Sequence, residues 1–325
     1  MTLMSQLSTL ESAGLIRLAR LEPDLEYLFR HALVQDAAYE SLLSRDQKRL
    51  HRAVGRAVEQ LYADRLDELA AMLARHFQRA GEDDRALYYF GCAAETALAA
   101  YANQEAENLY RSALALTCTE ERRADLLAGL GEALYRQSRF EEAILVWRQG
   151  IEVYQGLEDY GGVAHLYARS ARAAWYADDT PRGLKLCQEG LEIVAGAPES
   201  AEQARLLHEA GRAYHFNGLP QQARRLCQQA LEMAEKLGAV DVQTDALATL
   251  GVLPDQPAES SLAALKMAVE LAEEAGLLHT AARAHHNLGV MISALVGDLA
   301  SGREHFLKAV ELSRKRGAVS EEVLS

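Results

Sequence analysis

Proline is scarce in this sequence of 325 residues: there are 6, and none lies between residues 24 and 180. A proline inside a helix costs about 3 kcal/mol, so its absence favours long helices there. The 4 cysteines have no close pairs, which gives no sign of a zinc knuckle or a dithiol redox motif. We expect free thiols and no disulfide framework.

Targeting and membrane signals are also missing. The first 20 residues contain no basic start that leads into an apolar segment, and no apolar run is long enough to span a bilayer. The composition, 49% hydrophobic and 25% charged, is typical of an ordered globular chain. We therefore expect a cytoplasmic protein with no membrane partner.

Positive charge is in deficit, since 34 Lys and Arg stand against 47 Asp and Glu and the net charge is -13. Such a chain repels a phosphate backbone, so we expect no direct binding of nucleic acid. No P-loop, G-x-S-x-G, H-E-x-x-H or kinase motif occurs, so we expect no enzymatic activity and no cofactor. The densest histidine cluster contains His279, His285 and His286. Adjacent side chains on a helix do not face each other, so we expect no metal site.

A recurring pattern organises most of the chain. Leu130-Gly131 is followed by the small residue Ala143, the bulky Trp147 and the pair Gly150-Ile151. Similar copies recur at intervals of about forty residues, which indicates an internal structural repeat. Cys187 and Cys227 occupy the position of Trp147 in later copies, so we expect them to be buried packing residues.

This pattern resembles the tetratricopeptide repeat (TPR), a helix-turn-helix unit whose small residues let its two helices approach closely. The resemblance implies an all-α fold, a right-handed TPR-type α–α superhelical solenoid with a concave face. Five to six units would lie between residues 66 and 316. The spacing near forty exceeds the usual thirty-four, which predicts helices longer by about one turn.

The resemblance also implies a binding groove, because the first helix of each TPR unit lines the concave face. The residues at the groove positions of three successive first helices are Tyr135, Arg136, His165, Arg172, Trp175, Tyr176, Arg205, His208, Arg212, His215 and Phe216. Guanidinium groups bind carboxylates or phosphates, and aromatic rings bury apolar side chains. We predict a groove for an acidic or aromatic peptide. The alternative is that the rings pack between helices and the arginines pair with neighbouring acids.

The first 43 residues break the helical pattern. Residues 15–21 and 25–29 flank Glu22-Pro23-Asp24 with partly alternating apolar residues, which indicates a β-hairpin. A short helix over 5–13 precedes it and another over 31–43 follows. This order is typical of the second half of a winged-helix module. We expect a partial winged helix at 1–44 and a TPR-like solenoid at 45–325, with less regular helices at 45–118 and recognisable repeats at 122–317.

The same region resembles a junction in bacterial signal-transduction ATPases of the STAND type. The resemblance is carried by YLFRHALVQDAAYESLL at 27–43, by Arg49-Leu50-His51, and by residues 73–77 with Gly81. In that family a P-loop ATPase is followed by a winged helix and TPRs, and many members carry a class III adenylate or guanylate cyclase upstream. The resemblance implies a winged helix that packs rather than reads DNA, and an upstream ATPase or cyclase domain as a partner.

Three functions remain open at this point. The chain could be a sensor module that binds a peptide, protein or small ligand and regulates an attached or partner ATPase or cyclase. It could be a free-standing TPR scaffold or adaptor, or part of a large ATP-dependent transcription regulator. Ser320-Glu321-Glu322 has the cap and acidic residues of another helix start, so we expect further repeats. A solenoid end without a polar cap also makes a homodimer possible.

Overall fold

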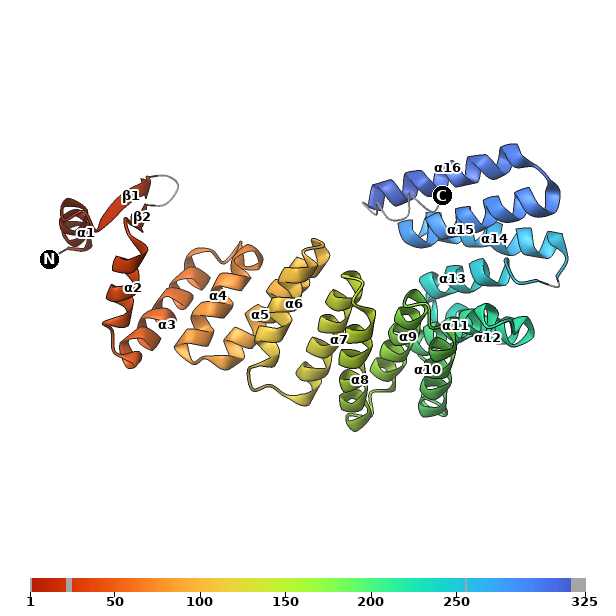
Figure 1. Ribbon diagram of the computed structural model, residues 1–325, viewed down its shortest axis with the longest axis horizontal. Coiled ribbons are helices and arrows are strands. Elements are labelled where there is room, and N and C mark those ends of the chain that lie inside the picture. Colours follow the sequence, from red (N-terminus) through yellow and green to blue (C-terminus); the bar gives the residue numbers. More distant parts are fainter. Residues whose placement is uncertain (1, 22–24, 255, 317–325) are drawn as a thin grey trace. The chain divides into compact units, whose positions relative to one another are not determined.

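The computed structural model describes residues 2–21, 25–254 and 256–316 (Figure 1). Within these ranges the chain consists of helices and one two-stranded antiparallel sheet, which confirms the predicted all-α solenoid class with a β-hairpin near the start. The chain divides into two compact units. Unit 1 comprises Met1–Thr96 and Ala115–Thr117, and unit 2 comprises Ala97–Leu114 and Cys118–Ser325. Each is described by itself.

Unit 1 begins with the predicted helix and hairpin. Helix α1 (Leu3–Ser12) ends near Gly14, whose φ of +71° suits a residue without a Cβ. Strands β1 (Ile16–Arg20) and β2 (Glu26–Phe29) then pair antiparallel. The hairpin is thus confirmed, although its expected turn at 22–24 lies outside the described residues. Its assignment to a winged helix stays a prediction.

The core of unit 1 is formed by three longer helices that follow α2 (Ala32–Glu40). They are α3 (Ser44–Leu61), α4 (Leu66–Ala80) and α5 (Asp83–Ala99). Phe77 is buried on α4, and its ring packs against the backbone of Gly55 on α3. A Cβ at Gly55 would lie 2.9 Å from that ring, so the close approach of the two helices depends on the missing side chain.

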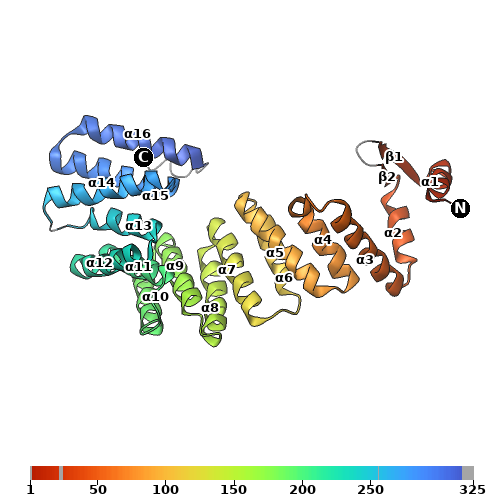
Figure 2. The same ribbon diagram turned by 180° about the vertical axis from the view of Figure 1, so that it is seen from behind.

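Unit 2 is a succession of helix pairs (Figures 1 and 2). Its helices are α6 (Asn103–Leu114), α7 (Glu120–Arg136), α8 (Phe140–Gly156), α9 (Tyr160–Tyr176), α10 (Thr180–Ile193), α11 (Ala201–Phe216), α12 (Pro220–Leu237), α13 (Val240–Leu250), α14 (Ala258–Glu274), α15 (Leu278–Met291) and α16 (Leu299–Arg316). From α6 to α16 each helix packs on the next. In addition, α9, α11, α13 and α15 contact one another in that order. These four helices, each the first helix of its pair, therefore form one continuous layer.

The repeat pattern is explained by how each pair packs. Trp147 on α8 is fully buried against Gly131 on α7, where a Cβ would lie 2.2 Å from the indole nitrogen. In a later pair, Gly211 lies opposite Cys227 in the same way. Cys187 and Cys227 are fully buried, as predicted. In these two copies the glycine of the first helix and the bulky residue of the second helix therefore form one close contact.

The last repeat departs from regular geometry. Helix α15 continues into a π-helix, η1 (Ile292–Val296), and Gly297 with φ of +77° precedes α16. The helix start expected at 320–322 lies outside the described residues. No helix among the residues described is long and apolar enough to cross a membrane.

Candidate functional site

The predicted groove residues all lie on three first helices of unit 2, α7, α9 and α11. Four aromatic side chains among them form a continuous row of ring contacts. Tyr135 contacts Tyr176 at 5.9 Å between ring centroids, Tyr176 contacts Trp175 at 4.7 Å, and Trp175 contacts Phe216 at 5.2 Å. Tyr176 is 50% exposed and Phe216 is 46% exposed, so the row presents apolar surface to solvent. We call Tyr135, Trp175, Tyr176 and Phe216 the aromatic row.

Two arginines beside the aromatic row share one carboxylate. Arg172 donates hydrogen bonds to both oxygens of Glu209, with Nε 3.0 Å from Oε2, and Arg212 donates to Oε2 at 3.0 Å. The side chains of Arg172, Arg212 and Glu209 are only 16%, 12% and 7% exposed. Burial alone would raise the pKa of Glu209, but the two guanidinium groups outweigh it and hold that pKa well below its usual range.

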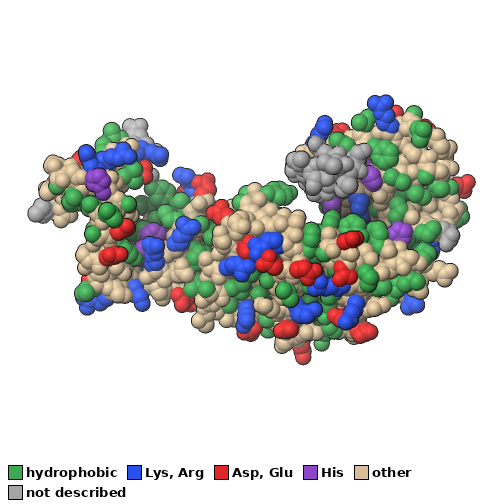
Figure 3. All heavy atoms as spheres, viewed as in Figure 1, with side chains coloured by type: hydrophobic (Ala, Val, Ile, Leu, Met, Phe, Trp, Pro, Cys, Tyr) green, Lys and Arg blue, Asp and Glu red, His purple; other side chains and the backbone are tan. Residues whose placement is uncertain are grey.

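The other arginines of the face also have acidic partners. Arg136 pairs with Glu132 at 2.8 Å, Glu132 also accepts from Arg169, and Arg205 pairs with Asp241. Figure 3 likewise shows acidic and basic side chains intermingled over the middle of the view, around α7 to α9. The arginine pairing expected in the alternative interpretation is therefore present, and the rings also pack against one another between helices. Tyr176 and Phe216 nevertheless remain exposed.

The three predicted histidines lie in different environments. His165 is exposed and His215 is partly buried, with its ring 5.3 Å from that of Phe216. His208 is fully buried and cannot contact a ligand from solvent, so its prediction as a groove residue is wrong. Its Nε2 lies 2.9 Å from Thr249 Oγ1, and burial lowers its pKa to about 3, which keeps the ring neutral.

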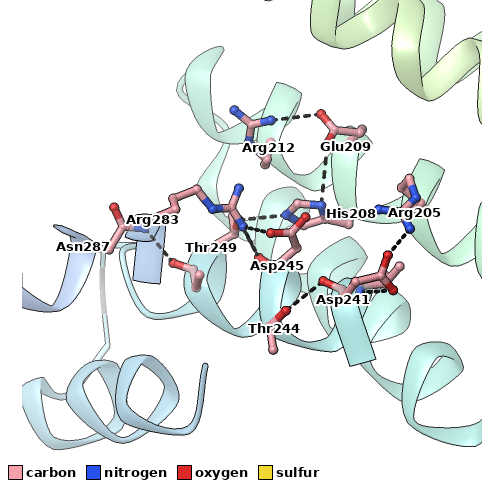
Figure 4. A network of polar contacts seen from close by, with 12 residues as sticks. Arg205, His208, Glu209, Arg212, Asp241, Thr244, Asp245, Thr249, Arg283 and Asn287 are labelled. Carbon is pink, nitrogen blue, oxygen red and sulfur yellow. Dashed lines mark hydrogen bonds and ion pairs between the residues drawn. The ribbon is translucent and has the colours of Figure 1, made fainter. Parts of the chain in front are cut away.

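Sequence reasoning expected acidic partners for the arginines only as its alternative interpretation, and it did not identify the carboxylates at the centre of this network. Glu209, Asp245 and Arg283 were not predicted, and Asp245 pairs with Arg283 beneath the face (Figure 4). A signal was nevertheless available. The charged pairs that join neighbouring first helices are separated by 36 to 38 residues, which is about one repeat. Opposite charges at that spacing would have indicated them.

A small pocket lies where α9, α10 and α11 meet. It is lined by Ala171, Trp175, Thr180, Gly183, Glu209, Arg212, Ala213 and Phe216. The volume that water can occupy in this partly open pocket is about 20 Å³, which is room for roughly one water molecule. A small molecule therefore cannot be enclosed there, and a ligand would have to lie across the open face.

The histidine cluster of the sequence is dispersed in the structure. His285 is buried with its Nδ1 2.9 Å from His305 Nδ1, whereas His286 packs against the ring of Phe306. Among the described residues no group of three His, Cys, Asp or Glu side chains is arranged to hold a metal ion.

Comparison with known proteins supports the fold. The tetratricopeptide repeat family model matches residues 204–237, which cover most of α11 and all of α12. No curated protein matches the chain.

Several solved structures are similar. One is a Signal Transduction ATPase with Numerous Domains (STAND) protein with a tetratricopeptide repeat sensor from Pyrococcus horikoshii, at 15% identity and a TM-score of 0.53. The match covers 99% of this chain and 57% of that one. A Rap protein complexed with Competence and Sporulation Factor has 14% identity, a TM-score of 0.57 and coverage of 89% and 88%. A plasmid Rap conjugation gene regulator in complex with the Phr* peptide has 11% identity, a TM-score of 0.55 and coverage of 87% and 79%. At these identities the likeness shows a TPR-type solenoid fold.

Proposed function

We propose that this chain is a protein-interaction module that binds a peptide across α7, α9 and α11. The observation that carries the proposal is the aromatic row, which exposes Tyr176 and Phe216 beside the buried arginines of α9 and α11. Exposed rings next to guanidinium groups are the residue types that dominate the energetics of peptide and protein interfaces. We call the surface formed by the aromatic row with Arg172 and Arg212 the binding face.

The comparisons support this proposal at the level of the fold. A TPR solenoid is typically an interaction scaffold, and one of the similar structures is a Rap regulator in complex with a peptide. The predicted contacts of this chain are Tyr135, Arg136, His165, Arg172, Trp175, Tyr176, Arg205, Arg212, His215 and Phe216. We propose no cofactor and no catalytic role for them.

Selection of binders from a random peptide library on the whole chain tests this function. Replacing Phe216 or Tyr176 with alanine is expected to weaken binding of the selected peptides roughly tenfold or more, because each change removes an exposed ring from the aromatic row. Leu145→Ala is the matched control, since Leu145 is an exposed apolar residue on α8. Selected peptides whose affinity is the same for all of these variants would contradict the proposed face.

A second, finer proposal is that the chain is the sensor arm of a STAND-type ATPase. The supporting observation is that nearly the whole chain aligns with part of a longer STAND protein. Residues 1–44 would then be the end of a winged helix between an ATPase or cyclase and the solenoid at 45–325. Ligand binding would favour one curvature of the stacked repeats and so bias the attached domain.

An immunoblot of the source cells with antibodies against this chain tests the finer proposal. A band far above 35.7 kDa is expected, followed by a change in nucleotide turnover of the parent protein on Phe216→Ala. A band at 35.7 kDa would contradict the sensor arm and favour a free-standing scaffold or adaptor.

A further inference from the structure

We propose that the binding face recognises a carboxylate of its peptide ligand through Arg212, with an apolar ligand residue beside it on Phe216. This inference rests on the proposed peptide-binding function and specifies the class of ligand. The preferred peptide would carry an acidic residue next to an apolar one.

The first argument is a local imbalance of charge. Three arginines, Arg172, Arg212 and Arg283, lie with two carboxylates, Glu209 and Asp245, on the layer of first helices. Figure 4 labels all of them except Arg172. All five side chains are largely buried, and the neighbouring His208 is neutral. One guanidinium charge is therefore in excess, although the whole chain carries a net charge of -13. A buried charge without a counter-ion is costly, so an anion from outside would be bound favourably.

The second argument identifies Arg212 as the group in excess. Arg172 donates hydrogen bonds to both oxygens of Glu209, and Arg283 donates to Asp245. Arg212 donates a single hydrogen bond, to Glu209 Oε2. Burial and the repulsion of Arg172 lower the pKa of Arg212 to about 10, while Glu209 raises that of Arg172 despite its burial. With one hydrogen bond to Glu209 against two from Arg172, Arg212 is the less compensated of the two cations.

The third argument is access. Arg212 lines the small pocket together with Trp175 and Phe216, whereas Arg172 does not. The guanidinium carbon of Arg212 lies 5.2 Å from the Trp175 ring centroid and 5.7 Å from that of Phe216. These contacts place the guanidinium group beside the half-buried ring of Trp175 and the exposed ring of Phe216. A ligand that lies across the open face would place its carboxylate at this pocket, beside Arg212.

The test uses three amidated, acetylated pentapeptides in which glutamate, glutamine or phosphoserine stands between two phenylalanines. Their binding to the whole chain is measured by ligand-observed NMR titration. The glutamate peptide is expected to bind at least tenfold more tightly than the glutamine peptide, and Arg212→Gln is expected to remove this difference. Arg225→Gln, at an exposed arginine on α12, is the matched control and should leave it unchanged.

Arg212→Gln should fold, because it leaves Arg172 and Glu209 as a complete pair. Glu209→Gln gives a second readout of opposite sign. It removes an internal anion, so the glutamate peptide should bind several-fold more tightly and the glutamine peptide should not change. Weaker binding of glutamate by Glu209→Gln would overturn the inference.

The remaining outcomes separate this inference from the proposed function. The glutamate and glutamine peptides could bind equally well, and Phe216→Ala could still abolish the binding of both. That result would overturn carboxylate recognition but support the peptide-binding function. If the phosphoserine peptide binds most tightly and Arg212→Gln removes that preference, the group recognised is a phosphate, and the inference of a carboxylate is overturned. Binding of none of the three peptides, with no binders from the random library, would overturn both proposals.

Discussion

At the scale of single residues, glycine sets the distance between the two helices of a repeat. A Cβ at Gly131 would lie 2.2 Å from the indole nitrogen of Trp147, so Gly131→Ala should force that pair apart. We expect a loss of about 1–3 kcal/mol in the free energy of unfolding, measured by urea denaturation. Gly156→Ala on α8 is the control, since its added Cβ meets nothing within 4 Å and should be neutral or stabilising. Equal effects of the two changes would contradict this account of the packing.

His208 makes stability depend on pH in a defined window. Its pKa is lowered to about 3 by burial, against 6.5 in an unfolded chain, so between these values the unfolded state binds more protons. Stability should therefore fall as the pH drops below about 6.5, by up to roughly 1.4 kcal/mol per pH unit from this group. The free energy of unfolding at pH 7 and pH 5 measures it.

The control for this pH dependence of stability is the variant His208→Gln. Other histidines with lowered pKa values, such as His165, act in the same direction in both proteins, so the variant isolates the contribution of His208. Its loss of stability between pH 7 and pH 5 should be smaller than that of the parent chain. An identical loss would show that His208 is not the titrating group.

At the scale of elements, buried ion pairs join the neighbouring first helices. Arg172 on α9 holds Glu209 on α11, and both side chains are largely buried. Arg172→Gln should lower the free energy of unfolding by about 2 kcal/mol, because it removes charge-assisted hydrogen bonds from a buried carboxylate. Arg136→Gln breaks a more exposed pair with Glu132 and should cost less than about 1 kcal/mol. Urea denaturation of both variants makes the comparison, and equal costs would mean that burial does not decide the value of these pairs.

At the scale of the whole molecule, unfolding should not be a single cooperative step. Each repeat packs mainly on its neighbours, and the chain forms two compact units. Both tryptophans, Trp147 and Trp175, lie in adjacent repeats of unit 2, so their fluorescence reports one region while far-UV circular dichroism reports every helix. We expect different urea midpoints from the two signals. Coincident midpoints would show that the array unfolds as one unit.

The helices and the repeat were predictable because both depend on the spacing of residues that lie close together in the sequence. The absence of proline from 24 to 180, and the recurrence of a small residue before a bulky one, predicted long paired helices that the structure confirms. The candidate face was predicted in part, since its aromatic and arginine residues stand at equivalent positions of successive repeats. The error at His208 came from treating that position as solvent-facing, whereas the adjoining first helix covers it with Thr249.

By itself the sequence determined the helical class, the repeat and the burial of Cys187 and Cys227, because these depend on residue size and periodicity within a helix pair. Opposite charges about one repeat apart made such pairs candidates, but the tertiary structure decided which of them form. Glu209 lies 37 residues from Arg172 and 3 from Arg212, and it became the shared partner of both when α9 packed on α11. Burial in the tertiary structure also lowered the pKa of Arg212, because its desolvation depends on the helices packed around it rather than on its neighbours in the chain.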